Sequence, residues 1–307
     1  MRVLITGGAG FIGGHAVQHF VSCGDEVLNV DNLTYAADKK NIDRSNFIKA
    51  DIADRELFQK ITKEFSPDFI VNFAAETHVD NSILSYEEFL HSNVIGTASV
   101  VSTCKNLGIK LCHISTDEVY GPASDVSFTE DDRLNPMNPY SASKAAGDLF
   151  VKSFHNTHKT PYVIVRPSNN YGPRQHEEKF IPKLLKCLQE GNKFPLYGDG
   201  NQVREWTYVK DTVAIIRKIL LNEDAWCSTY NLTSEVSMTN RQVIEATLEI
   251  INKKHGKNHK FEDVIQAVED RKGHDRKYFI SPVLLHNRIQ HSYKKFVEGL
   301  EEILNEQ

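Results

Sequence analysis

The feature that most constrains the fold of this chain is a glycine-spaced turn between its first strand and its first helix. Apolar residues over Arg2–Thr6 predict a short buried strand, and apolar residues at helical spacing over Phe11–Ser22 predict a helix. Gly7, Gly10 and Gly13 lie at and just after the junction. Such glycines permit a tight turn and let a diphosphate approach the positive end of the helix. The pattern predicts a dinucleotide-binding unit, with a glycine turn in an unrelated α/β protein as the alternative.

Strands and helices alternate along the first half of the chain, which predicts an α/β fold with a Rossmann-like, doubly wound parallel sheet. Further strands are expected at residues 26–30, 47–49, 69–73, 111–115 and 163–166, and helices at 54–65, 86–107 and from Asn138 onward. After Pro167 the pattern loosens, with helices expected at 209–221, 239–253 and 293–305. We predict a dinucleotide-binding domain over 1–167 plus about 203–231, and a smaller C-terminal substrate-binding domain over 168–202 and 232–307.

Asp31 indicates which dinucleotide the turn would bind. It ends the second expected strand, where its carboxylate can accept hydrogen bonds from the adenosine ribose and would repel a 2′-phosphate. NAD is therefore favoured over NADP, unless Asp31 is only a surface turn residue. Asp51 and Ile52, after the third strand, could hold the adenine edge. The expected NAD-binding residues are Gly7, Gly10, Phe11, Ile12, Gly13, Asp31, Asp51, Ile52, Ala74, Ala75, Thr77, Tyr140 and Lys144.

Tyr140 and Lys144 are four residues apart on an expected helix, so they share one of its faces. A free tyrosine has a pKa of about 10 and is a poor base at neutral pH. A nearby lysine and an oxidised nicotinamide would both lower that pKa, and the phenolate could then take a hydroxyl proton while the hydride goes to NAD. The spacing alone is common on helix surfaces. Together with the glycine turn, it predicts oxidation of an alcohol.

Asp117 and Glu118 follow the strand expected at 111–115. Neighbouring residues of a strand point to opposite faces, so both carboxylates can face a substrate only if the chain leaves the strand there, as Gly121-Pro122 suggests. Two carboxyl groups in one pocket cannot both ionise freely, so one should keep its proton. The pair predicts an acid and a base side by side, and two solvated loop residues are the alternative.

Composition excludes several classes of protein. The net charge of -5 and the pI of about 6.2 give no electrostatic footprint for nucleic acid. Five cysteines without a C-x-x-C pair favour neither disulfides nor a metal site and fit a reducing compartment. No leader precedes the first strand and no apolar run approaches the ~20 residues of a membrane helix, so we expect a cytoplasmic protein that does not bind membranes.

These segments together resemble the nucleotide-diphosphoglucose 4,6-dehydratases of the extended short-chain dehydrogenase/reductase superfamily. The resemblance runs along nearly the whole chain, and the adjacent carboxylates with the Ala-Ala-Glu-Thr-His segment are its most specific parts. The segments that carry it are 32–36, 74–80, 116–121, Tyr140 with Lys144, 168–173, 197–200, 204–206 and 273–276.

The resemblance implies a lyase that oxidises C4 of a hexose nucleotide, removes water across C5 and C6, and returns the hydride to C6, as in deoxyhexose (for example rhamnose) biosynthesis. It implies Thr116, Asp117, Glu118, Tyr140 and Lys144 as catalytic residues. It also implies tightly bound, recycled NAD and a homodimer packed through the helices at 86–107 and after Asn138. The implied substrate contacts are Thr116, Asn169, Asn170, Lys179, Tyr197, Arg204 and Arg271.

Three points stay open from the sequence. The nucleotide can be thymidine or uridine. Each arginine could be an ordinary surface charge, and Tyr197 could be core filling rather than a partner for the base. A nucleotide-sugar C4 epimerase would need Tyr140 and Lys144 but no carboxylate pair, and a non-catalytic NAD-binding regulator would need none of these residues.

Overall fold

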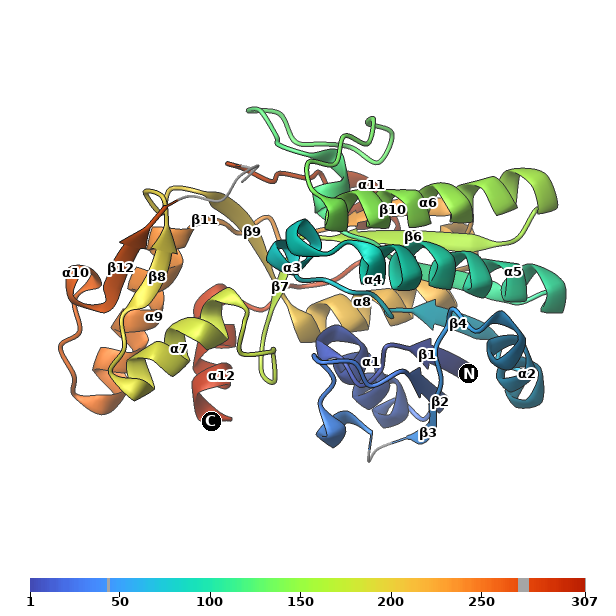
Figure 1. Cartoon of the computed structure of the whole chain (residues 1–307), viewed down its shortest axis with the longest axis horizontal. Coiled ribbons are helices and arrows are strands. Elements are labelled where there is room, and N and C mark those ends of the chain that lie inside the picture. The colour runs from blue at the N-terminus through green and yellow to red at the C-terminus, as the bar shows by residue number, and fades with distance from the viewer. Residues whose placement is uncertain (43–44, 270–275, 307) are drawn as a thin grey trace.

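The structure, a computed structural model, describes residues 1–42, 45–269 and 276–306. In this part of the chain seven parallel strands form one sheet in the order β10-β6-β5-β4-β1-β2-β3 (Figure 1). The α/β class and the parallel sheet predicted from the sequence are thus confirmed. The strands are β1 (Arg2–Thr6), β2 (Glu26–Asp31), β3 (Asn46–Lys49), β4 (Phe69–Asn72), β5 (Lys110–Ile114), β6 (Tyr162–Pro167) and β10 (Ser228–Leu232).

Helices cover both faces of this sheet, giving three layers (Figure 1). Successive residues of β1 point to opposite faces, so Val3 packs with α1 and α8 whereas Leu4 packs with α2 and α5. Both β1 faces are therefore buried, which explains the continuous apolar run. The covering helices are α1 (Phe11–Ser22), α2 (Arg55–Phe65), α5 (Thr97–Leu107), α6 (Pro139–His158), α8 (Val209–Leu221) and the short α11 (Val283–Arg288).

The single helix expected at 86–107 is instead three consecutive helical segments. These are α4 (Glu87–Phe89), the π-helical η2 (Leu90–Gly96) and α5. Asn93 in η2 is buried and bonds to the backbone of Glu76 in both directions, at 2.9 and 3.0 Å, and to Ser143 Oγ at 2.8 Å. A π turn inside a helix often accompanies a functional site, and periodicity of apolar residues does not reveal one.

The second group of elements lies at the end of the molecule away from β1 and holds the C-terminus (Figure 1). It contains two small sheets, β11-β9-β7 and β12-β8, packed with helices over a core that includes Tyr171, Trp206 and Phe296. The exact division of the chain into two domains stays a prediction. The elements are β7 (Asn169–Tyr171), α7 (Phe180–Glu190), β8 (Phe194–Tyr197), β9 (Val203–Tyr208), β11 (Ser237–Thr239), α9 (Asn240–His255), α10 (Phe261–Val264), β12 (Ile265–Val268) and α12 (Phe296–Asn305).

Most element boundaries predicted from the sequence agree with the structure to within about three residues. The strand β10 was not predicted, because its residues are mixed polar and apolar although four of the five are buried. Short segments complete the described chain: α3 (Val79–Leu84), η1 (Lys39–Asn41), η3 (Asp117–Tyr120) and η4 (Glu223–Ala225). Within the described ranges no helix combines the length and apolar character that crossing a membrane requires.

Candidate active site

The glycine turn has the geometry that a bound diphosphate needs. Gly7 has a φ of 70°, and a Cβ there would lie 2.6 Å from the backbone nitrogen of Ala74. A Cβ on Gly13 would lie 2.2 Å from the carbonyl oxygen of Gly7. Gly10 is the N-cap of α1 and adds no side-chain cap, so the first-turn amides stay available to an anion. The turn therefore fits the pyrophosphate of a dinucleotide.

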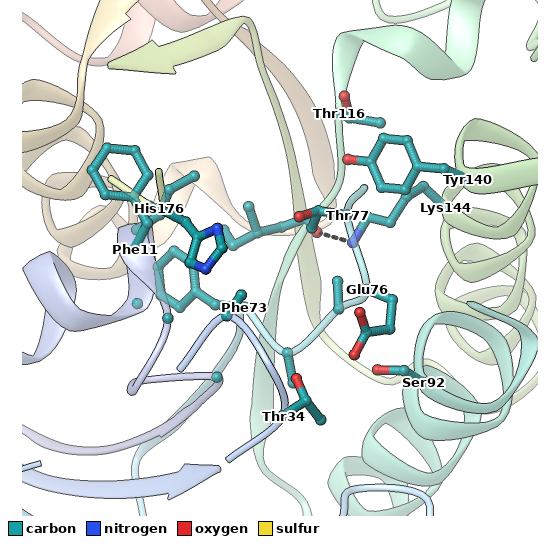
Figure 2. Close-up of a pocket in the computed structure, with 18 of the residues that line it drawn as sticks. Phe11, Thr34, Phe73, Glu76, Thr77, Ser92, Thr116, Tyr140, Lys144 and His176 are labelled. Carbon is teal, nitrogen blue, oxygen red and sulfur yellow. Dashed lines mark hydrogen bonds between the residues drawn. The ribbon is translucent and has the colours of Figure 1, made fainter. Parts of the chain in front are cut away.

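A pocket of about 390 Å³ extends from this turn across the carboxyl ends of the central strands. Figure 2 shows Phe11, Phe73 and His176 on one side of it, and Thr116, Tyr140 and Lys144 on the other. Every residue predicted to bind NAD lines this pocket, and so do the five predicted catalytic residues. The structure thus brings together residues that are up to 137 positions apart in the sequence, from Gly7 to Lys144.

Asp31 and Asp51 line the pocket where β2 and β3 end. The Asp31 carboxylate accepts hydrogen bonds from the backbone amides of Ala9 at 2.9 Å and Leu33 at 2.7 Å. Burial raises the pKa of Asp31, although these two hydrogen bonds oppose the rise. Each carboxylate oxygen keeps a further lone pair for a ribose hydroxyl. The Asp51 carboxylate accepts from His91 Nε2 at 2.9 Å, which orients it toward the same pocket.

The adjacent carboxylates leave the strand as the sequence predicts. β5 ends at Ile114, and Asp117 and Glu118 begin the 3₁₀ turn η3. The Thr116 hydroxyl accepts a hydrogen bond from the Glu118 amide at 3.3 Å and fixes the start of the turn. Asp117 is buried, and its pKa lies well above the usual range because of burial and then the neighbouring charges of Glu118 and Glu205. The direction of this shift favours a proton on Asp117.

Tyr140 and Lys144 sit on the first turns of α6, whose start is fixed by a capping box between Asn138 and Ser141. The Lys144 ammonium donates to the Ile114 carbonyl at 2.6 Å, and burial lowers its pKa to about 8. Burial, with the charges of Glu118 and Asp117, raises the pKa of Tyr140. The expected lowering of that pKa by Lys144 is therefore not seen in the protein alone, where burial and the two carboxylates determine the shift. The cationic nicotinamide is the remaining group that would favour the phenolate.

A second pocket, of about 350 Å³, adjoins the first on the side of the C-terminal elements. Five residues line both pockets and mark the junction between them: Thr77, Glu118, Asn169, Glu178 and Lys179. Arg204 lines the second pocket, with its guanidinium 4.3 Å from the centroid of the Tyr278 ring. Tyr197 lines it as well. Six of the seven predicted substrate contacts therefore line one or other of these two adjoining pockets.

Two of the predicted substrate contacts differ from the others. The Asn170 amide lines the first pocket but is engaged by the protein: its nitrogen donates to the Ser168 carbonyl at 2.9 Å and its oxygen accepts from Thr212 at 2.6 Å. These two bonds fix the orientation of the Asn170 amide at the pocket wall and leave its second N–H for a ligand. Arg271 lies outside the described residues.

Two further residues of the site were not found from the sequence. Asn93 ties the segment after β4 to α6, as described above. Glu205, on β9, is fully buried, accepts the Ile280 amide at 3.0 Å, and has its pKa raised to about 7 by burial. Its charge is also one cause of the raised pKa of Asp117. A glutamate between an arginine and a tryptophan gives no sequence signal of a buried role.

Comparison with known proteins identifies the class that the fold and the pocket define. Residues 3–232 match the NAD dependent epimerase/dehydratase family, and the chain belongs to that family. This confirms the sequence prediction of an NAD-binding enzyme of the extended short-chain superfamily.

The relatives within the family are more specific. The chain is 45% identical over 288 residues to the low-salt glycan biosynthesis protein Agl12 of Haloferax volcanii, covering 91% of this chain and 90% of that protein. It is 39% identical over 311 residues to the dTDP-glucose 4,6-dehydratase of Mycobacterium tuberculosis, covering 98% and 91%. The crystal structure of DesIV, a dTDP-glucose 4,6-dehydratase of Streptomyces venezuelae with NAD and TYD bound, superposes with a TM-score of 0.92 at 36% identity, covering 99% of this chain and 96% of that one. The resemblance to 4,6-dehydratases is thus confirmed.

Proposed function

We propose that this protein is an NAD-dependent hydro-lyase that converts a nucleotide-diphosphoglucose to the 4-keto-6-deoxy sugar nucleotide. The observation that carries the proposal is that Asp117 and Glu118 line the same pocket as Tyr140 and Lys144. A dehydrogenase site beside a carboxylate pair can oxidise an alcohol and then eliminate water. The relatives named as dTDP-glucose 4,6-dehydratases support this function.

The first stage is oxidation at C4. NAD, when bound, accepts a hydride from C4 and later gives it back to C6. Tyr140 takes the proton of the C4 hydroxyl, and Thr116, on the same side of the pocket (Figure 2), holds the C4 oxygen. Lys144 lies beside Tyr140 at the same end of the pocket (Figure 2) and would hold the nicotinamide ribose.

The second stage is loss of water. A ketone at C4 makes the C5 proton acidic, and Glu118 removes it. Asp117 then gives its proton to the departing C6 hydroxyl, which leaves as water. The raised pKa of Asp117 suits this role, because an acid must still hold its proton at neutral pH. Once the hydride has returned to C6, C5 takes back a proton and the 4-keto-6-deoxy product is complete.

The second pocket binds the nucleotide diphosphate in this proposal. Arg204 and Lys179 supply cationic groups for phosphate oxygens, and Asn169 supplies an amide at the junction of the pockets. Tyr197 stacks on the base. We favour thymidine over uridine as the nucleoside, because several relatives are named as dTDP-glucose 4,6-dehydratases.

The test is incubation of the protein with dTDP-glucose and, separately, with UDP-glucose. A 4-keto-6-deoxy product, detected by its absorbance in alkali, supports dehydration, and the nucleotide with the higher kcat/KM is the preferred one. Formation of the galactose nucleotide would instead support the C4 epimerase, which needs no carboxylate pair. A Tyr140→Phe variant should form neither product and serves as the control for contaminating enzymes.

We also propose that the protein is a cytoplasmic homodimer. The five cysteines are free, in keeping with a reducing compartment. Large apolar side chains are exposed on η2 and α6, including Leu90, Ile95, Leu149 and Phe150, and a helical face of this kind suits a second copy. Light scattering should give the mass of two chains for the native protein and of one chain for Leu149→Glu. A native monomer would contradict the dimer.

A further inference from the structure

The carboxylate of Glu178 contacts side chains from three separate segments of the chain. It lies in the loop between β7 and α7, and its side chain is only 17% exposed. Its carboxylate accepts a hydrogen bond from the Tyr35 hydroxyl at 3.1 Å and lies 3.4 Å from Lys179 Nζ. His78 Nε2 and His176 Nδ1 approach it at 3.6 and 3.5 Å. One carboxylate thus meets the segments after β2, after β4 and after β7.

All three segments line the cofactor pocket, and the contact between the first and the third of them closes on Glu178. Thr34 and Ala36, on either side of Tyr35, line that pocket from the segment after β2. His176 and Glu178 line it from the segment after β7, and Figure 2 shows Thr34 and His176 among the residues around the cavity. The bond from Tyr35 to Glu178 therefore joins one wall to the other.

A second contact reinforces this junction. The rings of Tyr35 and His176 meet edge to face, with centroids 5.7 Å apart. Burial and the neighbouring Glu178 charge raise the pKa of Tyr35, so its hydroxyl stays protonated and can donate to the carboxylate. On the third segment, the Thr77 carbonyl accepts a hydrogen bond from Lys179 at 3.3 Å.

We propose that Glu178 is a clasp residue that retains NAD by holding the Tyr35 segment against the loop between β7 and α7. In the proposed reaction the hydride that leaves C4 returns to C6, so the dinucleotide has no need to leave between turnovers. Its departure requires these two walls to separate, and separation breaks the bond between Tyr35 and Glu178. The predicted role of this bond is to slow NAD release, and it takes no part in the chemical steps.

Tyr35→Phe is the sharpest variant, because Tyr35 does not line either pocket and the change removes only the hydroxyl that bonds to Glu178. Glu178→Gln is less selective, since Glu178 also neighbours Lys179 at the junction of the pockets. Glu177→Gln is the matched control. Glu177 lines neither pocket, is 64% exposed, and pairs with Lys186 at 2.7 Å on the surface.

The experiment measures release of NAD from the holoenzyme. Each protein is loaded with radiolabelled NAD and chased with excess unlabelled NAD, and the label that stays on the protein is followed with time. Loss of one hydrogen bond to a charged group should raise the release rate of Tyr35→Phe by about tenfold. Glu177→Gln should release NAD at the native rate. Combining Tyr35→Phe with Glu178→Gln should give no faster release than Glu178→Gln alone.

Release of NAD from Tyr35→Phe at the native rate would overturn the proposal. A double variant whose effects simply add would overturn it as well, because the two residues would then act separately. The assay contains no sugar nucleotide, so its result is independent of the proposed dehydration. If Tyr35→Phe releases NAD at the native rate but the protein still dehydrates its substrate, the proposed function stands and only the role proposed for Glu178 is wrong.

Discussion

Arg166 donates a hydrogen bond from Nε to Oδ2 of Asp148 at 2.9 Å, and both side chains are fully buried. The same guanidinium donates to the Tyr120 hydroxyl at 2.6 Å. Asp148 belongs to α6, which carries Tyr140, and Tyr120 closes the η3 turn that carries Asp117. A single arginine on β6 therefore braces the two elements whose side chains must meet at the sugar.

Arg166→Met should destabilise the fold by about 3–5 kcal/mol, because it leaves the buried Asp148 carboxylate without its cation. Denaturant unfolding at pH 7 measures the change. The matched control is Arg2→Met, which breaks an exposed pair with Glu26 and should cost less than about 1 kcal/mol. Equal costs for the two changes would contradict the role of Arg166. Adding Asp148→Leu to Arg166→Met should recover part of the loss, since no unpaired charge then remains.

Asp117→Asn should stop the reaction after oxidation. The variant cannot supply a proton to the C6 hydroxyl, so water loss should slow by about 10²–10⁴. Oxidation at C4 needs Tyr140 rather than Asp117 and should continue. Stopped-flow absorbance of the reduced nicotinamide should therefore rise and persist with dTDP-glucose. Dehydration at the native rate would remove Asp117 as the acid.

Glu118→Gln should block proton removal from C5. In heavy water the native enzyme is expected to place deuterium at C5 of the product, because C5 is reprotonated in the site. The variant should form product more slowly by about 10²–10⁴, and any residual substrate should show no deuterium at C5 by NMR. Deuterium entering C5 at the native rate in this variant would assign the base to another residue.

The raised pKa of Asp117 and the buried charge of Glu205 predict how the rate of dehydration depends on pH. The acid form of Asp117 exists below its pKa, so dehydration should fall as pH rises through that raised value. Glu205, whose pKa is about 7, is charged mainly above that pH and then favours the proton on Asp117. Removing this charge in Glu205→Gln should lower the pKa of Asp117.

The alkaline limb of the kcat profile of Glu205→Gln should therefore move to lower pH. The control is Glu249→Gln, at an exposed position of α9, which should leave the limb in place. If Glu205 has only a structural role, its variant will lose stability while the limb stays where it is. That outcome would contradict the electrostatic link.

The cofactor end of the site was predictable because its signals are local. The glycine turn and Asp31 each follow a strand that is predicted by its run of apolar residues. The carboxyl ends of parallel strands meet at one edge of a sheet, so the two features are expected to lie close together. The departure of Asp117 from β5 was predictable from the glycine and proline that follow it. Such features depend on a few neighbouring residues, so the sequence displays them directly.

The braces and the clasp could not be predicted from the sequence. Arg166 meets Asp148 and Tyr120 only because β6, α6 and η3 pack together. The sequence does not show which residues a polar side chain of a buried strand will contact. Glu178 and Tyr35 lie 143 positions apart and meet across a cavity. Asn93 in the π segment bonds to Glu76 and Ser143, and helical periodicity does not encode such partners. Pairings that need the finished fold are invisible to local patterns.

The central claim is that the hydride lifted from C4 returns to C6 of the same sugar after water has been lost. Incubation with dTDP-glucose carrying deuterium at C4, followed by NMR and mass spectrometry of the product, tests it directly. We predict a 4-keto-6-deoxy product that keeps the deuterium, all of it in the C6 methyl group. A product whose methyl group carries no deuterium, or a galactose nucleotide with deuterium still at C4, would contradict the account.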